Sequence, residues 1–158
     1  MGDQPNYGQP MQPQSAGAKW GPTAIGSLEA HIVAGLGYFF TPVLPFIFFL
    51  MEKTNKFVRF HAMQSMILGV VAIAWYVIVV IINSIIFAAS LADTSGTVST
   101  VGTLGSCLIG CLYIVGGLGL FGLWLWGIIS AFTGKYQKLP VIGNLAEKWA
   151  GGPAQPAY

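Results

Sequence analysis

The sequence predicts an all-α integral membrane protein with three transmembrane helices and a short interfacial amphipathic helix near the C-terminus. Two observations on composition predict it: of the 158 residues, 54% are hydrophobic and only 8% are charged. A soluble domain of this size exposes too much surface to hide so many apolar side chains, and soluble domains average about 25% charged residues. The third observation is that the apolar residues gather in three long segments rather than in alternating runs, which is typical of membrane-spanning helices.

Both ends of the chain are polar and rich in Pro, Gln and Gly. Residues 1–25 contain repeated Pro and Gln, and residues 151–158 read GGPAQPAY. Neither stretch has an apolar face to bury, so both are expected to be disordered. The first also lacks a basic start followed by an apolar core, so it is not predicted to be a signal peptide.

The helical membrane domain is predicted between residues 26 and 150. Its apolar segments run over about 30–51, 65–92 and 105–132. A helix of about 20 residues crosses roughly 30 Å of hydrocarbon and satisfies its own backbone polar groups there. Pro42 and Pro45 interrupt the first segment and predict a kink. The alternative is a re-entrant hairpin, in which case the chain crosses the membrane only twice.

The basic residues follow the first and third segments. They are Lys53, Lys56 and Arg59, and then Lys135, Lys138 and Lys148. The loop over residues 91–104 has no Lys or Arg. The positive-inside rule places both basic groups in the cytoplasm. With three crossings, the N-terminus is expected outside and the C-terminus inside a bacterial cytoplasmic (inner) membrane.

Residues 55–65, NKFVRFHAMQS, form a polar motif at the start of the second segment. Asn55 is suited to cap a helix. The residues at helical spacing on one face are Phe57, Phe60, His61 and Gln64. One interpretation makes Arg59, His61 and Gln64 a recognition site at the membrane surface. The commoner arrangement has Arg59 binding lipid phosphate while His61 and Gln64 hydrogen-bond between helices.

A second motif, GKYQKLPVIGNLAEK, covers residues 134–148. Pro140 suits the first position of a helix. The apolar stripe that follows consists of Val141, Ile142, Leu145 and Trp149. The pattern predicts a short helix over about 140–150, lying on the cytoplasmic leaflet or docking on a partner.

Together the two motifs resemble a family of small bacterial and archaeal membrane proteins of unknown function. That group is commonly linked to the Tic-twenty-like family, named for a component of the chloroplast inner-envelope import machinery. A more distant resemblance is to the magnetosome membrane proteins that influence magnetite crystal growth. The resemblance implies no active site, only positions that fix the fold and its lipid contacts. These positions are Phe57, Arg59, His61, Ala62, Gln64, Leu139, Pro140 and Gly143.

Small residues at helical spacing predict where helices approach closely in lipid. They are Ala30 and Ala34 in the first segment, and Gly102, Ser106, Gly110, Gly116, Gly119 and Gly122 in the third. They serve either packing within one chain or association between chains. Asn83, within the second segment, is expected to form a hydrogen bond between helices.

No metal site or cofactor is predicted. Cys107 and Cys111 lie four residues apart, with His31 expected near the same outer face, but a fourth ligand is lacking. His31 and His61 are expected at opposite membrane faces, roughly 30 Å apart. Either one alone could ligate a porphyrin or chlorophyll of a neighbouring complex.

Several classes of protein are disfavoured. The sequence has no Ser nucleophile elbow, HExxH, P-loop or paired carboxylates, so no enzyme is predicted. No acidic residue lies mid-segment, which disfavours ion-coupled transport. A net charge of +2 is too small for nucleic-acid binding. No small-molecule substrate is expected either.

We therefore predict a non-enzymatic accessory, assembly or scaffold subunit of a larger membrane complex. Its expected partners are membrane lipids, together with further copies of itself or other subunits. The alternative, implied by the family resemblance, is a component of a protein-translocation apparatus. A weaker alternative is a metal- or pigment-associated subunit.

Overall fold

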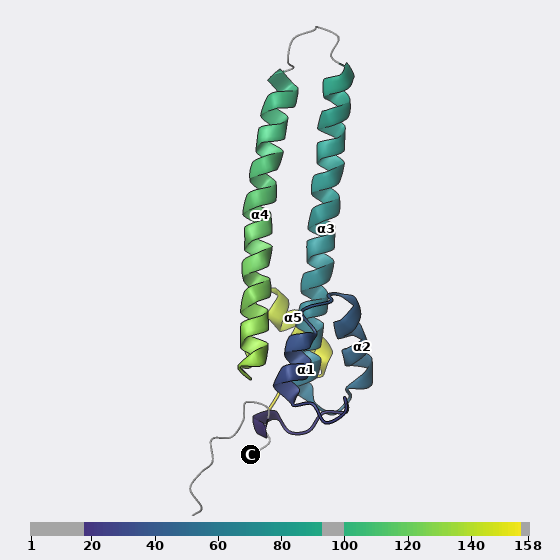
Figure 1. Ribbon diagram of the computed structural model, residues 1–158, viewed down its shortest axis with the longest axis vertical. Coiled ribbons are helices and arrows are strands. Elements are labelled where there is room, and N and C mark those ends of the chain that lie inside the picture. Colours follow the sequence, from purple (N-terminus) through teal and green to yellow (C-terminus); the bar gives the residue numbers. More distant parts are fainter. Residues whose placement is uncertain (1–17, 93–99, 156–158) are drawn as a thin grey trace, which may run out of the picture.

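The computed structural model describes residues 18–92 and 100–155, which are helical with no strand in these ranges. Two long helices dominate it: α3, Lys56–Ala92, and α4, Thr100–Phe132, lie side by side and antiparallel (Figure 1). Their 37 and 33 residues correspond to about 55 and 50 Å. Both helices are long and apolar enough to cross a membrane.

The first apolar segment is not one helix. It is divided into α1, Ala30–Leu36, and α2, Val43–Met51, joined by the turn at residues 37–42. With seven and nine residues, these helices span about 10 and 14 Å, too little to cross the hydrocarbon. The prediction of three spans is not confirmed, because a residue that precedes Pro is disfavoured in a helix and Pro42 donates no amide hydrogen. The described residues contain two candidate spans.

Both described ends of the chain lie at one end of the hairpin. The short 3-10 helix η1, Ala18–Trp20, and helix α5, Ile142–Ala150, join α1 and α2 there (Figure 1). Trp20 Nε1 donates to Gly134 O over 2.8 Å, which ties the two ends together. The expected placement of the N- and C-termini on opposite membrane faces is not confirmed, because both described ends of the chain lie at the same end of the hairpin. We call this end, formed by residues 18–65 and 130–155, the cap.

The segment at residues 18–25 is folded, although its composition suggested disorder. Trp20 is buried and stacks on Phe57, with ring centroids 4.4 Å apart. At the other end of the chain, Ala154 packs against the same core. One aromatic side chain is enough to hold a polar segment in place, because it buries a large apolar area. The rest of the predicted tails, residues 1–17 and 156–158, lies outside the described residues.

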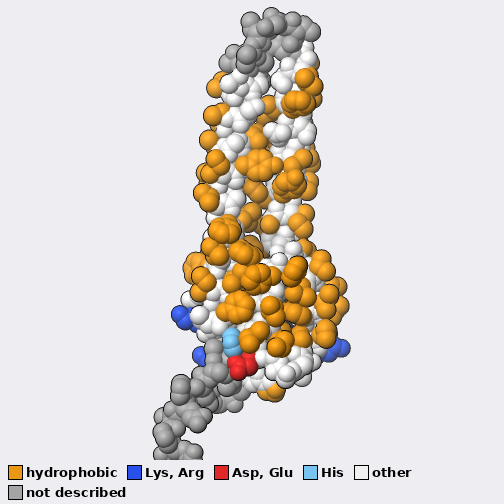
Figure 2. Space-filling view, viewed as in Figure 1, with side chains coloured by type: hydrophobic (Ala, Val, Ile, Leu, Met, Phe, Trp, Pro, Cys, Tyr) orange, Lys and Arg blue, Asp and Glu red, His pale blue; other side chains and the backbone are white. Residues whose placement is uncertain are grey.

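Three glycines of α4 mark where side chains from α3 and from the 37–42 turn pack closely against this helix. Glycines spaced eleven residues apart on α4 each receive a large side chain, so a Cβ at any of them would collide with it. These glycines are Gly105, Gly116 and Gly127, and the side chains they receive are those of Ile86, Trp75 and Tyr38. The remaining surface of the hairpin consists mainly of exposed apolar side chains (Figure 2), as expected of helices surrounded by lipid.

Candidate functional site

Asn55 begins helix α3 and anchors the N-terminal segment. Its Oδ1 accepts hydrogen bonds from the amides of Phe57 (3.1 Å) and Val58 (3.2 Å), which is the capping role predicted from the sequence. Its Nδ2 donates to the carbonyls of Trp20 (2.9 Å) and Pro22 (3.1 Å). Asn55 therefore holds residues 20–22 against the start of α3.

Glu52 is a buried carboxylate that accepts hydrogen bonds mainly from the backbone. Its Oε2 accepts from the Ala24 amide (2.6 Å), and its Oε1 accepts from the amides of Thr54 (3.0 Å) and Asn55 (2.9 Å). Burial raises the pKa of Glu52, but these bonds to the charged form outweigh burial and leave the pKa below its ordinary value. Within the described ranges Glu52 forms no ion pair with Lys or Arg.

His61 and Gln64 form a buried network with Tyr38, and all three side chains are fully inaccessible to solvent. Gln64 Nε2 donates to Tyr38 Oη (3.0 Å), and Gln64 Oε1 accepts from the Leu139 amide (3.0 Å). His61 Nε2 lies 3.2 Å from Lys135 O, and its Nδ1 lies 3.4 Å from Tyr38 Oη. The network joins α3 to the 37–42 turn and to the segment that follows α4.

The three residues of the predicted recognition site lie in different environments. His61 and Gln64 lie inside the protein, so they are not available at the membrane surface. Both ring nitrogens of His61 already face protein oxygens, which leaves no free nitrogen for a pigment or haem. Of the three residues proposed for recognition, only Arg59 lines a pocket.

Arg59 lies at the junction of α2, α3 and α5. Its Nε donates to Ala150 O (3.2 Å), and its Nη1 donates to Glu52 O (2.9 Å). The guanidinium lies over the Phe49 ring, 4.2 Å from the centroid, in a cation–π arrangement. Both hydrogen-bond acceptors are neutral carbonyls, so the positive charge is not matched by an anion among the described residues.

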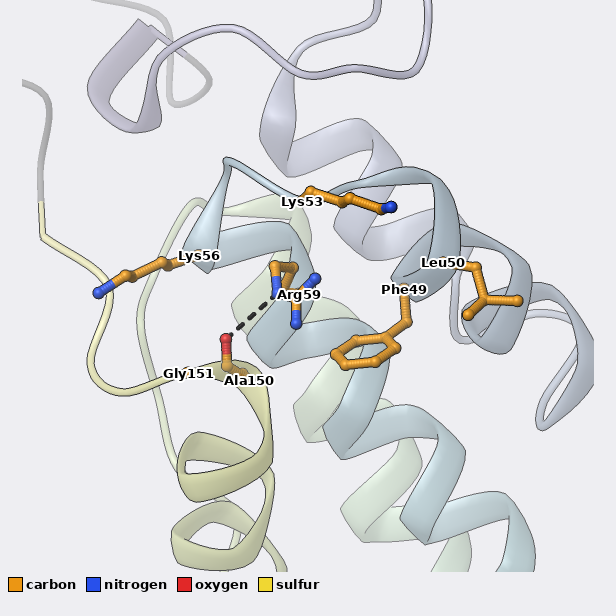
Figure 3. Close-up of a pocket in the computed structure, with 7 residues that line it drawn as sticks. All are labelled: Phe49, Leu50, Lys53, Lys56, Arg59, Ala150 and Gly151. Atoms are coloured by element: carbon orange, nitrogen blue, oxygen red, sulfur yellow. Dashed lines mark hydrogen bonds between the residues drawn. The ribbon is translucent and has the colours of Figure 1, made fainter.

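Arg59 lines a pocket of about 410 Å³ between these three helices. We call it the basic pocket; its lining residues are Phe49, Leu50, Lys53, Lys56, Arg59, Ala150 and Gly151. Lys53 and Lys56 extend to either side of Arg59 (Figure 3). No Asp or Glu from the part of the chain that the structure describes lines the pocket, so its chemistry suits an anion.

Helix α5 packs against α3 instead of lying on the membrane surface alone. It begins at Ile142, two residues later than predicted, and its buried face contains Ile142, Gly143 and Ala146. Leu145 and Trp149, two residues of the predicted apolar stripe, are exposed.

Residues of the second motif also contribute to the packing of α5. Leu139 is buried, and Pro140 is exposed. Gly143 lies so close to Lys138 that a Cβ would come within 2.7 Å of the Lys138 Cα. Only glycine fits at this position without a shift of the backbone.

The residues considered for a metal site lie apart. Cys107 and Cys111 are exposed on α4. His31 lies in α1, where the neighbouring Gly35 contacts Phe132 at the other end of α4. Phe132 is 21 residues from Cys111, about 30 Å along the helix. Placing His31 beside the cysteines and opposite His61 was therefore wrong. Among the described residues no three His, Cys, Asp or Glu side chains come together.

The residues predicted to pack helices are found in different environments. Ala30 and Ala34 are buried in the cap, and Gly116 receives Trp75. Several others face away from the chain: Ser106 is exposed, and Gly110, Gly119 and Gly122 have open space where a Cβ would lie. Gly102 is half-buried. Asn83 is exposed on α3 and forms no hydrogen bond within the described ranges, contrary to its expected role between α3 and α4.

The match to a family model covers the first motif and most of the second. Residues 25–146 match the model of the magnetosome magnetite crystal formation protein family. The chain belongs to this family. It is also 31% identical over 126 residues to a UPF0132 membrane protein of Archaeoglobus fulgidus, which covers 79% of this chain and 99% of the relative.

Two UPF0132 membrane proteins of Methanocaldococcus jannaschii are similar as well. One is 33% identical over 132 residues, covering 82% of this chain and 96% of the relative. The other is 30% identical over 126 residues, covering 80% of this chain and 73% of the relative. No solved structure matches the chain. The names of the relatives, together with two long apolar helices, identify a membrane protein; these matches do not show the Tic-twenty-like relationship suggested by the motifs.

Proposed function

We propose that the protein is a non-enzymatic subunit of a larger membrane assembly, held in the cytoplasmic membrane by the α3–α4 hairpin. The observation that supports this most is the exposed amide of Asn83, which follows a run of apolar residues over 66–82 of α3. An amide in lipid gains stability from a hydrogen-bonding partner. On α4, Gly110, Gly119 and Gly122 leave room for another helix to approach. A second copy of this chain would satisfy both features.

The charges support a cytoplasmic position for the cap. All seven Lys and Arg residues of the chain belong to its cap, and none lies between residues 60 and 134. Figure 2 shows the basic side chains only at this end of the molecule. By the positive-inside rule, the chain enters and leaves the membrane from the cytoplasm, and the far end of the hairpin faces outside.

The apolar surface of α1 and α2 supports contact with the cytoplasmic leaflet. Phe39, Phe40 and Phe46 are 54%, 71% and 49% exposed. Such a cluster is unfavourable in water and favourable in lipid. Short helices at membrane depth are tolerated when protein surrounds their backbone. We infer that α1 and α2 form a re-entrant pair, which makes membrane lipids the first partner of the cap.

The description of the family names magnetite crystal formation as an activity of its members. For this chain we propose an assembly role, which the exposed amide of Asn83 and the open glycines of α4 support.

Cysteine cross-linking in native membranes tests the proposal. In a background with Cys107→Ser and Cys111→Ser, we expect Asn83→Cys and Gly119→Cys to give cross-linked products, either with a second copy or with another subunit. The matched control is Ala131→Cys, because Ala131 is fully buried within the cap and should not react. A chain that gives no product at either exposed position, and has a monomer mass in lipid nanodiscs, would overturn the proposal.

A further inference from the structure

We propose that the basic pocket binds the phosphate group of an anionic phospholipid in the cytoplasmic leaflet. The proposal goes beyond the assembly role and does not depend on the number of copies. It rests on the hydrogen-bonding capacity of Arg59, on the charge around it and on the apolar wall beside it.

Arg59 has N–H groups available for a ligand. A guanidinium carries five N–H groups. Among the described residues two of these groups donate to protein acceptors, one on Nε and one on Nη1. The remaining N–H groups are on the terminal nitrogens, which form the planar fork that matches a phosphate. The two backbone bonds and the Phe49 ring hold this fork in one orientation. The site is therefore built before a ligand arrives.

The charge near the pocket is unbalanced. Arg59, Lys53 and Lys56 bring three positive charges to a lining without Asp or Glu. The carboxylate of Glu52, next to Lys53 in the sequence, accepts hydrogen bonds from the amides of Ala24, Thr54 and Asn55 and does not line the pocket. Glu147 of α5 is paired with Lys138 (2.8 Å) and accepts a hydrogen bond from Tyr136 (2.9 Å). The bond from Lys138 lowers the pKa of Glu147, so this pair persists at neutral pH. An external anion is required to neutralise the pocket.

The apolar wall distinguishes a lipid from a free phosphate. Phe49 and Leu50 line the pocket on the α2 side. Leu50 and the adjacent Met51 are 54% and 53% exposed, so the wall continues onto the lipid-facing surface of α2. Acyl chains can lie against α2 while the phosphate reaches Arg59. The 410 Å³ volume also falls within the range of small-molecule sites.

Native mass spectrometry of the full chain in neutral detergent tests the pocket directly. We expect phosphatidylglycerol to bind at least tenfold more tightly than phosphatidylcholine, whose choline cancels the phosphate charge. In Lys53→Gln/Lys56→Gln, both changes are at exposed positions, and binding of phosphatidylglycerol should weaken by about tenfold or more, since each cation near a lipid phosphate contributes about fivefold. Arg59→Lys keeps the charge but loses the fork, so it should also weaken binding.

The matched control is Lys135→Gln/Lys148→Gln, which removes two exposed cations from the same end but outside the pocket. This variant should change binding less than twofold. Equal weakening in the two double variants, or equal binding of the two lipids, would overturn the proposal. Glycerol phosphate and inorganic phosphate serve as soluble competitors. Neither should displace the lipid, and displacement at equal concentration would overturn the assignment to a lipid.

Discussion

Four buried polar side chains join parts of the cap that are distant in the sequence. Asn55 and Glu52 hold residues 20–24, while His61 and Gln64 hold the segment at residues 135–139. Removal of any of them leaves a buried partner without a hydrogen bond, which costs about 1–3 kcal/mol. The polar residues of the first motif are therefore mainly structural, and Arg59 is the exception.

Gln64 provides the first test at this scale. Gln64→Leu removes the acceptor of the buried Leu139 amide and the donor to Tyr38. We expect a loss of about 2 kcal/mol in the free energy of unfolding, measured as a lower melting temperature in detergent. The control is Gln137→Leu, whose bond to Trp126 is exposed and should cost less than about 1 kcal/mol. Similar losses in both variants would contradict the assigned role.

Glu52 makes stability depend on pH. Its pKa in the folded protein is below the ordinary value of 4.5, so the carboxylate stabilises the fold fully above about pH 4.5. This contribution is lost as the pH falls through the folded pKa. Glu52→Gln should lower the melting temperature at pH 7, and its difference from the unchanged protein should shrink below pH 4.5. A difference that is constant from pH 7 to pH 3 would show that ionisation of Glu52 is unimportant.

At the scale of elements, the hairpin is held by shape rather than by polarity. Apolar side chains surround α3 and α4, so hydrophobicity does not select the faces that meet. Gly105 and Gly116 select them, because they leave space for Ile86 and Trp75 of α3. Gly127, at the same spacing, receives Tyr38 of the 37–42 turn. Residues at this spacing return to nearly the same face of a helix, since 11 residues make about three turns.

Two substitutions on α4 should separate packing within the chain from packing between chains. Gly116→Leu collides with Trp75 and should destabilise the hairpin by about 1–3 kcal/mol, seen as a lower melting temperature. Gly119→Leu meets open space in its own chain and should leave this temperature within the error of measurement.

The same two substitutions also test the assembly proposal. Gly119→Leu should reduce the cross-linking of Asn83→Cys between copies, if the second helix approaches this face. Equal effects of the two substitutions on melting temperature would contradict the register of α3 against α4.

At the scale of the whole molecule, the proposed topology has two crossings, with both described ends of the chain in the cytoplasm. Cysteines placed at Lys19 and Lys148, in the background without Cys107 and Cys111, should both be protected in intact cells and react after the membrane is opened. A cysteine at Ala92, at the far end of α3, should react with an impermeant maleimide from outside. Labelling of position 19 from outside would restore the arrangement with three crossings.

Much of this molecule could be predicted without coordinates. The second and third apolar segments form α3 and α4. Asn55 caps the start of α3, as its position before the helix predicted. Helix α5 begins within two residues of the expected position. The interruption of the first segment, which Pro42 and Pro45 predicted, is the break between α1 and α2, and the re-entrant arrangement stays a prediction. The folding of residues 18–25 was missed, because composition measures average polarity, whereas the buried Trp20 and the hydrogen bonds from Asn55 and Glu52 anchor the segment.

The candidate site, too, could be predicted only in part. The sequence by itself determined that lipid surrounds most of the chain and that its cations gather beside the apolar segments. The reason is that the preference of a segment for lipid or water is the sum of the preferences of its residues. Only the tertiary structure decided that His61 and Gln64 are buried while Arg59 faces a pocket. Those three residues share one short helical stretch, and their environments differ because α1, α2 and α5 cover different sides of it. Which side is covered depends on contacts between segments up to about a hundred residues apart, and local sequence does not encode such contacts.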